Sequence, residues 1–404
     1  MGSLPRMLAF AWRFRDKNLL FSGELSEESR FVFRRSIHER VREIAPFLFW
    51  DPDAQPVISG GRIHWILDGY VASSTYPLAR RLEFPAAGSI RYLRNSVKAV
   101  VDAVTGRVTL YRVDDDDPIL ATYARIFPGL IEPQSEMPAE LRAHLRYPTL
   151  FLLAQAEILK EYHVDEPLAF YAGQDLWQLP HGFGSAAAVY RPIHSLMKLP
   201  AEDDVEFLLP IPFIARGRQN MTALLVARND PPNYGQLVLL ELPRDQQVPG
   251  PNQVAALMEQ DPAISPQLSL WRQAGSEVNL GYLRVLPLED AFLYLQPIFL
   301  SARESSIPEL ARVVASDGRS VTMATSLEEA VRQLRSPMDP PRAEARGEGG
   351  EAPAMPGVEG EWSRRALELM NEAEQRLRSG DWAGFGERWN ALRAWLQRSR
   401  PNER

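Results

Sequence analysis

The chain has 404 residues, of which 45% are hydrophobic and 24% are charged, and its formal net charge at pH 7 is −7. This composition predicts globular domains with substantial cores, two or three of them at ~100–200 residues each. The acidic balance argues against a nucleic-acid partner, because a dedicated nucleic-acid-binding protein carries a basic domain. The absence of cysteine excludes disulfides, thiolate metal sites and cysteine nucleophiles. No apolar run reaches the ~20 residues that cross a bilayer, and the run Met7–Trp12 is too short for a signal-peptide core.

The first 50 residues read as helical. Ser26 is the predicted N-cap, and apolar residues then recur at helical spacing at Phe33, Ile37, Val41 and Ile44. Arginines occupy the other faces. A surface helix packed on a core is the favoured interpretation, and a helix lying on an anionic membrane surface is the alternative.

Three aspartates surround a predicted strand at residues 62–67. Asp51 and Asp53 precede the strand, Arg62 begins it, and Asp68 follows it. Carboxylates at a strand end can line a cleft, and two of them at a defined separation can act as acid and base. The simpler interpretation is that these side chains cap turns. The four residues are therefore binding candidates, and no residue is assigned a catalytic role.

A hairpin is predicted at residues 94–113, with its turn at Thr105-Gly106. Four aspartates follow, at positions 114–117. Their spacing does not match a calcium-binding loop, so we expect Asp117 to be the N-cap and Pro118 the first residue of a helix. No metal site is predicted.

The segment from Ala188 to Met323 is predicted to be rich in strands. Its most distinctive stretch is Pro210–Gly235, where Arg216, Arg218 and Asn220 lie in a turn between two apolar runs. A structural role is favoured for these polar side chains, with Asn220 fixing the turn. Contact with an anion or an envelope polymer is the alternative, provided that both arginines face solvent.

These patterns predict an α+β fold with mostly antiparallel sheet and flanking helices. We expect a mixed α+β region at residues 1–180 and a β-rich domain at residues 181–335. Residues 336–360, rich in Pro and Gly, predict a flexible linker. Residues 361–404 predict a hairpin of two helices that docks elsewhere, because two short helices bury too little surface to stand alone.

Many phrases of the chain together resemble one family. They include FRDKNLLFSGEL, SIHERVREIAPFLFWD, GRIHWILDGYVASSTYP, RYLRNSVKAVVDAVTGRVTLYRVDDDDPIL, GRQNM, ARNDPPNYG and QDPAISPQLSLW. The family is UPF0182, uncharacterised multi-pass membrane proteins of bacteria, and the resemblance covers nearly the whole chain except the linker. It departs from the family pattern at Asp68-Gly69-Tyr70-Val71 and at Asp53-Ala54-Gln55.

The resemblance implies membrane-spanning helices followed by a large extracytoplasmic portion, of which this chain matches the later part. A truncated or split reading frame is therefore expected, with the extracytoplasmic face of the cell membrane as its location. The expected partner is the family's own membrane-spanning region or another envelope protein. The resemblance supplies no catalytic residue and no cofactor.

Three hypotheses about function remain. The favoured one is a non-enzymatic binding or assembly domain in the bacterial envelope, because the sequence contains no Ser-His-Asp, HExxH or phosphate-loop pattern. The second is an envelope hydrolase or transferase that uses paired carboxylates among Asp51, Asp53 and Asp68. The third is a soluble cytosolic protein.

Overall fold

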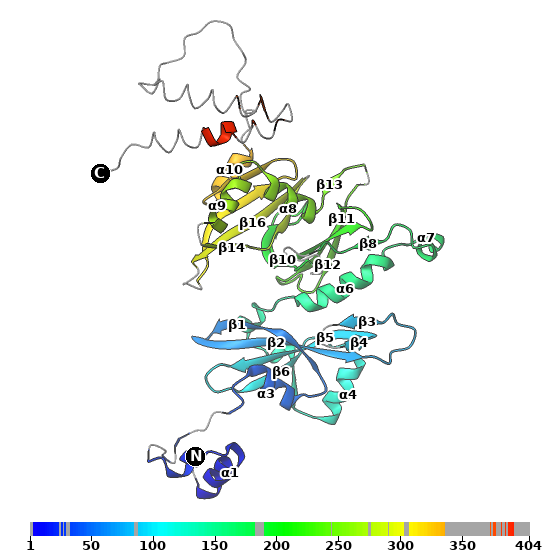
Figure 1. Cartoon of the computed structure of the whole chain (residues 1–404). Helices are drawn as coiled ribbons and strands as arrows, with labels where there is room; N and C mark the ends of the chain where they lie inside the picture. The colour runs from blue at the N-terminus through cyan, green and yellow to red at the C-terminus, as the bar shows by residue number, and fades with distance from the viewer. Residues whose placement is uncertain are drawn as a thin grey trace, which may run out of the picture. The chain divides into compact units, whose positions relative to one another are not determined.

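The computed structural model describes residues 3–23, 26, 28–29, 33–84, 88–181, 190–243, 245–273, 276–289, 291–302 and 307–335, and in the C-terminal part residues 372, 375–376, 381, 384 and 387–391. The chain divides into two units, residues 1–338 and 339–404. The first unit combines antiparallel sheets with helices (Figure 1), which confirms the predicted α+β class. Its helical segments are α1 (Leu4–Phe14), α2 (Asn18–Phe21), α3 (Ile37–Ile44), α4 (Pro118–Ile126), the 3₁₀ helix η1 (Gln134–Glu136), α5 (Ala139–Arg142), α6 (Thr149–Tyr162), α7 (Pro167–Tyr171), α8 (Pro251–Gln260), α9 (Ser265–Gln273) and α10 (Leu327–Arg335).

The first sheet has the strand order β1–β2–β5–β6–β7. Its strands are β1 (Phe49–Ser59), β2 (Arg62–Ser73), β5 (Tyr92–Asp102), β6 (Val108–Arg112) and β7 (Ile131–Pro133). Neighbours run antiparallel except β6 and β7, which run parallel because α4 carries the chain back between them. A separate ribbon of β3 (Leu82–Phe84) and β4 (Gly88–Ile90) precedes β5.

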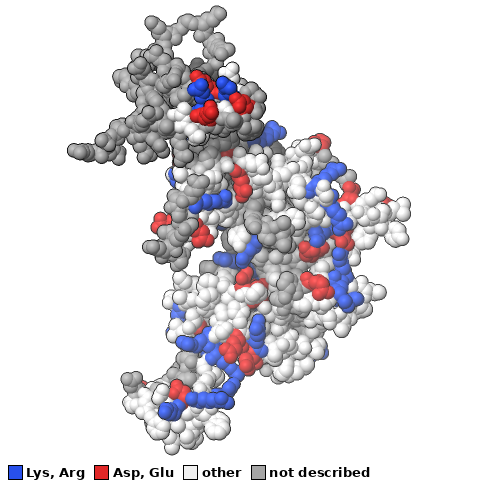
Figure 2. Space-filling model, in the orientation of Figure 1, with Lys and Arg blue, Asp and Glu red and all other residues white. Residues whose placement is uncertain are grey.

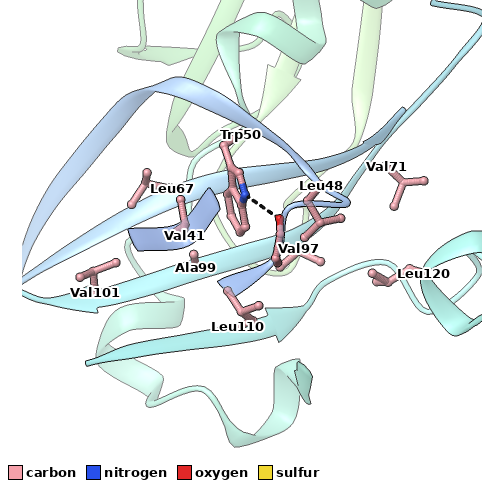
Figure 3. Packing of buried hydrophobic residues seen from close by; sticks show 11 residues of the cluster. Val41, Leu48, Trp50, Leu67, Val71, Val97, Ala99, Val101, Leu110 and Leu120 are labelled. Atoms are coloured by element: carbon pink, nitrogen blue, oxygen red, sulfur yellow. Dashed lines mark hydrogen bonds between the residues drawn. The ribbon is translucent and has the colours of Figure 1, made fainter. Parts of the chain in front are cut away.

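Trp50 lies in the centre of the core that covers this sheet (Figure 3). Its indole Nε1 donates a hydrogen bond of 3.2 Å to the carbonyl oxygen of Ala45. Gly69 stands opposite on β2, where a Cβ would lie 2.9 Å from the indole ring. Val41 of α3 and Leu120 of α4, both fully buried, close the core. A glycine in β2 therefore makes room for the largest side chain of this core.

Two of the predicted boundaries differ from the structure. Helix α3 is capped by Ser36, whose hydroxyl accepts from the backbone N–H of Glu39, whereas Ser26 was the expected cap. Strand β2 does not end before Asp68 but continues to Ser73, because its backbone keeps pairing with β5. By contrast, Asp117 caps α4 as predicted.

The second sheet has the order β12–β11–β10–β8, with β13 also paired to β11 and β9 to β10. Its strands are β8 (Trp177–Gln178), β9 (Ser195–Lys198), β10 (Val205–Ala215), β11 (Asn220–Arg228), β12 (Leu237–Glu241) and β13 (Val248–Pro249). Strands β10 and β11 are almost continuously buried. Their apolar side chains pack against α6, with Leu152 and Phe213 fully buried.

The third sheet has the order β14–β16–β17–β18, with β15 also paired to β16. Its strands are β14 (Ser276–Leu280), β15 (Arg284–Leu288), β16 (Ala291–Ala302), β17 (Glu309–Ser316) and β18 (Val321–Ala324). Helices α8 and α9 share a core with this sheet through Val254, Leu268 and Val285. Asp261 lies at the break between these helices, where α8 has ended at Gln260 and α9 has yet to begin at Ser265.

The predicted linker at residues 336–360 lies outside the described residues, and the predicted hairpin is described only at scattered positions. The carboxylate of Asp381 accepts a 2.9 Å hydrogen bond from the backbone N–H of Gly384, the contact expected of an N-cap.

Candidate functional site

A buried polar cluster joins the first sheet to the second. We define it by Asp51, Asp68, Tyr70, Lys98, Tyr147 and Asn229. The first four of these stand on β1, β2 and β5, and the last two lie before α6 and after β11. Two of the predicted candidates, Asp51 and Asp68, therefore belong to one cluster.

Asp51 is bound by a phenol. It is buried, in a bulge of β1, and its Oδ2 accepts a hydrogen bond of 2.6 Å from the hydroxyl of the fully buried Tyr70. Burial raises the pKa of Asp51, while the bond from Tyr70 opposes that rise. Burial, reinforced by the charges of Asp68 and Asp51, holds the pKa of Tyr70 well above its usual value. The hydroxyl of Tyr70 therefore keeps its proton, and the carboxylate of Asp51 accepts the hydrogen bond.

Asp68 is bound by a lysine. Lys98 lies directly opposite in the register of β2 and β5, and its Nζ forms an ion pair with Asp68. Nζ also donates to the carbonyl oxygen of Arg146 at 3.0 Å, and the amide of Asn95 donates to Asp68 at 2.9 Å. Burial alone would lower the pKa of Lys98, but the adjacent carboxylate outweighs that effect and raises it. Lys98 therefore stays charged inside the protein.

The segment Arg146-Tyr147 is held from the other side by the second sheet. The side-chain oxygen of the buried Asn229 accepts from the backbone N–H of Tyr147 at 2.6 Å. The ring of His194 donates through Nε2 to the carbonyl oxygen of Tyr147 at 3.0 Å, and the hydroxyl of Tyr234 donates to the carbonyl oxygen of Arg146 at 3.3 Å. Burial lowers the pKa of His194 from 6.5 to about 4, so this ring is neutral at pH 7. Polar groups from both sheets therefore form hydrogen bonds with this one short segment.

The cluster is built to hold the structure together. The carboxylates of Asp51 and Asp68 both have partners inside the protein, and so does the ammonium of Lys98. A general acid or base needs room for a substrate within hydrogen-bond reach. The hollows described below are lined by other residues.

The other two candidates of the N-terminal region, Asp53 and Arg62, have side chains that pair outside this cluster, although the backbone N–H of Asp53 donates a hydrogen bond of 2.9 Å to the carboxylate of Asp51. Asp53 is exposed and pairs with Arg191 at 3.5 Å. Arg62 stands at the far end of β2, where it pairs with Asp102 at 3.5 Å. The first sheet therefore separates Arg62 from the aspartates that it was expected to accompany.

Arg216 and Arg218 lie in the exposed turn between β10 and β11. Arg218 lines a hollow of about 680 Å³ whose remaining charged groups include four carboxylates, those of Asp165, Glu166, Asp175 and Glu241. With four acids and one guanidinium, the charge of this hollow favours a cationic ligand over an anionic one. The prediction of an anion contact gains no support from this lining.

Asn220 has a structural contact. Its side-chain oxygen accepts a hydrogen bond of 3.1 Å from Gln253 of α8, and the oxygen of Gln253 in turn accepts from the N–H of Gly250. Asn220 therefore ties the hairpin of β10 and β11 to the start of α8. The sequence reasoning expected Asn220 to fix the turn itself, whereas the structure places it at the start of β11 and gives it this contact with α8.

Four polar residues around the cluster were not singled out by sequence reasoning: Lys98, Tyr147, His194 and Asn229. Lys98 carried a readable signal, since it is the one charged residue in the apolar run Val97–Val101. A lysine at such a position needs a buried partner. The other three gave no comparable signal, because Asn229 and His194 meet at the backbone of Tyr147 and only the fold brings these residues together.

The described residues contain no group of three or more His, Asp or Glu side chains that could hold a metal ion. Among the described helices, none combines the length and the apolar character needed to cross a bilayer. Lysine and arginine side chains alternate with acidic ones on the face shown in Figure 2.

These features define the class. The chain is an α+β protein of mostly antiparallel sheets, and its candidate site is a buried polar cluster whose charged groups have partners within the protein. The chain belongs to the uncharacterised protein family UPF0182, whose model matches residues 1–271. It is 42% identical over 394 residues to a UPF0182 protein of Moorella thermoacetica, covering 97% of this chain and 43% of the relative. It is 40% identical over 403 residues to one of Cupriavidus necator (98% and 43%) and 40% identical over 401 residues to one of Geobacter sulfurreducens (98% and 44%).

The chain thus spans less than half the length of these curated relatives. No solved structure matches it.

Proposed function

We propose that the chain is an extracytoplasmic portion of a bacterial envelope membrane protein and that it serves in binding or assembly. Its partner in this proposal is the membrane-spanning region of the same protein, or another envelope protein. One observation carries the proposal: helix α1 presents an apolar stripe to the outside.

The stripe consists of Leu4, Leu8 and Trp12, which recur every four residues along one side of α1. Their exposed fractions are 66%, 50% and 88%. The opposite side of α1 already makes contacts within the chain, because Phe10 and Phe14 pack against Phe33 with ring centroids 5.6 and 5.8 Å apart. The stripe is therefore left over after the helix has packed within the chain.

Basic side chains accompany the stripe. Arg6, Arg13, Arg15 and Lys17 are all exposed on or just after α1, and in Figure 2 the surface over α1 is largely white with basic groups beside it. A helix with an exposed Trp and Leu stripe and a basic flank is typical of segments that lie in a membrane interface. Exposed apolar stripes of this kind also mark protein contacts.

The relatives support a partner within the same polypeptide. More than half the length of each relative has no counterpart in this chain. The membrane-spanning region implied by the family resemblance would supply an apolar surface that α1 can contact.

Topology is the test. Because the chain contains no cysteine, a single introduced thiol gives a clean label. Leu168→Cys, at a site that is 76% exposed, should react with a membrane-impermeant maleimide in spheroplasts of the producing cells. Leu208→Cys, fully buried, is the matched control and should stay unlabelled. Labelling of Leu168→Cys only after the inner membrane is opened would place the chain inside the cell and overturn the proposal.

Hydrolysis by paired carboxylates is less well supported. The candidate aspartates of the cluster are engaged by Tyr70 and by Lys98. A nucleophile or base in that position would first have to break a buried hydrogen bond or ion pair.

A further inference from the structure

An apolar groove lies between α6, the ribbon of β3 and β4, and the edge strand β12. Its volume is about 510 Å³, within the range typical of pockets that hold small molecules. Apolar side chains dominate its lining, among them Ile90, Ala154, Leu225 and Leu237.

The floor of the groove is rigid. Ile90, Ala154 and Leu225 are 4%, 5% and 3% exposed and belong to the packed cores beneath. The wall formed by β12 is open, since Leu237 is 40% exposed on a strand that has a neighbour on one side only. An apolar groove of this size is unfavourable in free energy while it is exposed to water, so a ligand or partner that covers it is expected.

The polar rim decides which ligand fits. Arg80 is already paired with Glu161, and the amide oxygen of Gln155 accepts from the hydroxyl of Tyr147. Arg91, half-buried at the groove, makes no ion pair with any residue that the structure describes. The rim therefore presents one guanidinium to the groove whose charge is not balanced by an acidic partner from the described chain.

We infer that this groove binds a long-chain fatty acid, with the acyl chain along the floor and the carboxylate on Arg91. Apolar surface removed from water supplies most of the affinity. The guanidinium selects the ligand, because its planar donors match the two oxygens of a carboxylate. This inference does not depend on the membrane topology proposed above.

The test is a titration of the whole purified chain with a dansyl-labelled undecanoic acid, followed by displacement with palmitic acid. Saturable binding is expected. Arg91→Gln should weaken binding of the acid roughly ten- to a hundredfold, because it removes the charged hydrogen-bond donor of the carboxylate. The same substitution should leave binding of the methyl ester unchanged. Arg319→Gln, at an exposed arginine of the third sheet's β17–β18 turn that does not line the groove, is the matched control.

A second variant tests the apolar groove itself through a residue that lies outside the buried core. Leu237→Glu places a charge on the exposed wall and should abolish binding of both acid and ester, whereas Leu196→Glu, at a site 70% exposed on β9, should not. Urea unfolding of each variant confirms that it folds. The inference is overturned if the wild type shows no saturable binding, if acid and ester bind equally well, or if Leu237→Glu binds as the wild type does.

Discussion

Asp68 and Lys98 face each other across β2 and β5 as a directly paired couple, and Lys98 is 1% exposed. A lysine so deeply buried is retained only where a carboxylate and hydrogen bonds satisfy it. The pair also reaches beyond its own sheet, because Lys98 donates to the carbonyl oxygen of Arg146. This cross-strand pair therefore joins β2 to β5 within the first sheet. It also helps to hold the segment that leads to the second sheet.

Replacing Asp68 should be strongly destabilising. Asp68→Asn leaves the ammonium of Lys98 buried without its counter-charge, and breaking a buried pair on one side costs about 3–5 kcal/mol of the free energy of unfolding. Urea denaturation at pH 7 measures the loss. Arg62→Met is the matched control, because the guanidinium of Arg62 is exposed in its pair with Asp102, and such a pair contributes about 0–1 kcal/mol. Similar losses in the two variants would contradict the importance of the buried pair.

His194 should make stability depend on pH. The folded protein holds its pKa at about 4, against 6.5 in an unfolded chain, because the ring is buried. The unfolded state therefore binds the proton first as pH falls, so the contribution of His194 is fully present above pH 6.5 and is lost toward pH 4. The slope from this one group is at most about 1.4 kcal/mol per pH unit.

The measurement is urea denaturation of the wild type and of His194→Gln at several pH values between 7.5 and 4. Asp51 has a raised pKa and acts with the opposite sign at lower pH, but it is present in both proteins and cancels in the comparison. The wild type should lose more stability than the variant across this window. Parallel curves would show that His194 does not titrate as described.

Gly250 should not accept a side chain. A Cβ there would collide with the backbone carbonyl of Gln219, which cannot move aside as a flexible side chain can. Gly250→Ala should therefore lower the free energy of unfolding by about 1–3 kcal/mol and disturb the contact of Gln253 with Asn220. Gly23→Ala is the control, because nothing lies within 4 Å of its Cβ position. The measurement is thermal unfolding of the two variants, and equal melting temperatures would contradict the prediction.

The stripe on α1 should bind to membranes. Trp12→Ser should reduce cosedimentation of the chain with vesicles of equal parts phosphatidylglycerol and phosphatidylcholine by roughly tenfold, because burying such a side chain contributes about 1.5–3 kcal/mol. Leu196→Ser, which removes an exposed apolar side chain elsewhere, should have no effect. High salt should weaken binding through the arginines. Equal binding by both variants would remove the support that α1 gives to the proposed function.

Part of the candidate site could be predicted from the sequence. Asp51 and Asp68 stand out there because they are carboxylates beside an apolar strand. Their partners are less visible: Lys98 is 30 positions away from Asp68, and Asn229 is 82 positions away from Tyr147. Hydrogen bonds over such separations depend on strand register and on how two sheets meet, which local patterns do not encode.

The sequence by itself determined the α+β class, the hairpin at residues 94–113, the cap at Asp117 and the family, because alternation, turn residues and capping act over a few positions. Tertiary structure decided the rest. It extended β2 past Asp68 by pairing it with β5, and it separated Arg62 from the aspartates. It also left α1 with an exposed stripe and opened the groove beside Arg91. Burial and exposure of these groups follow from the packing of distant segments, and that packing is a property of the whole chain.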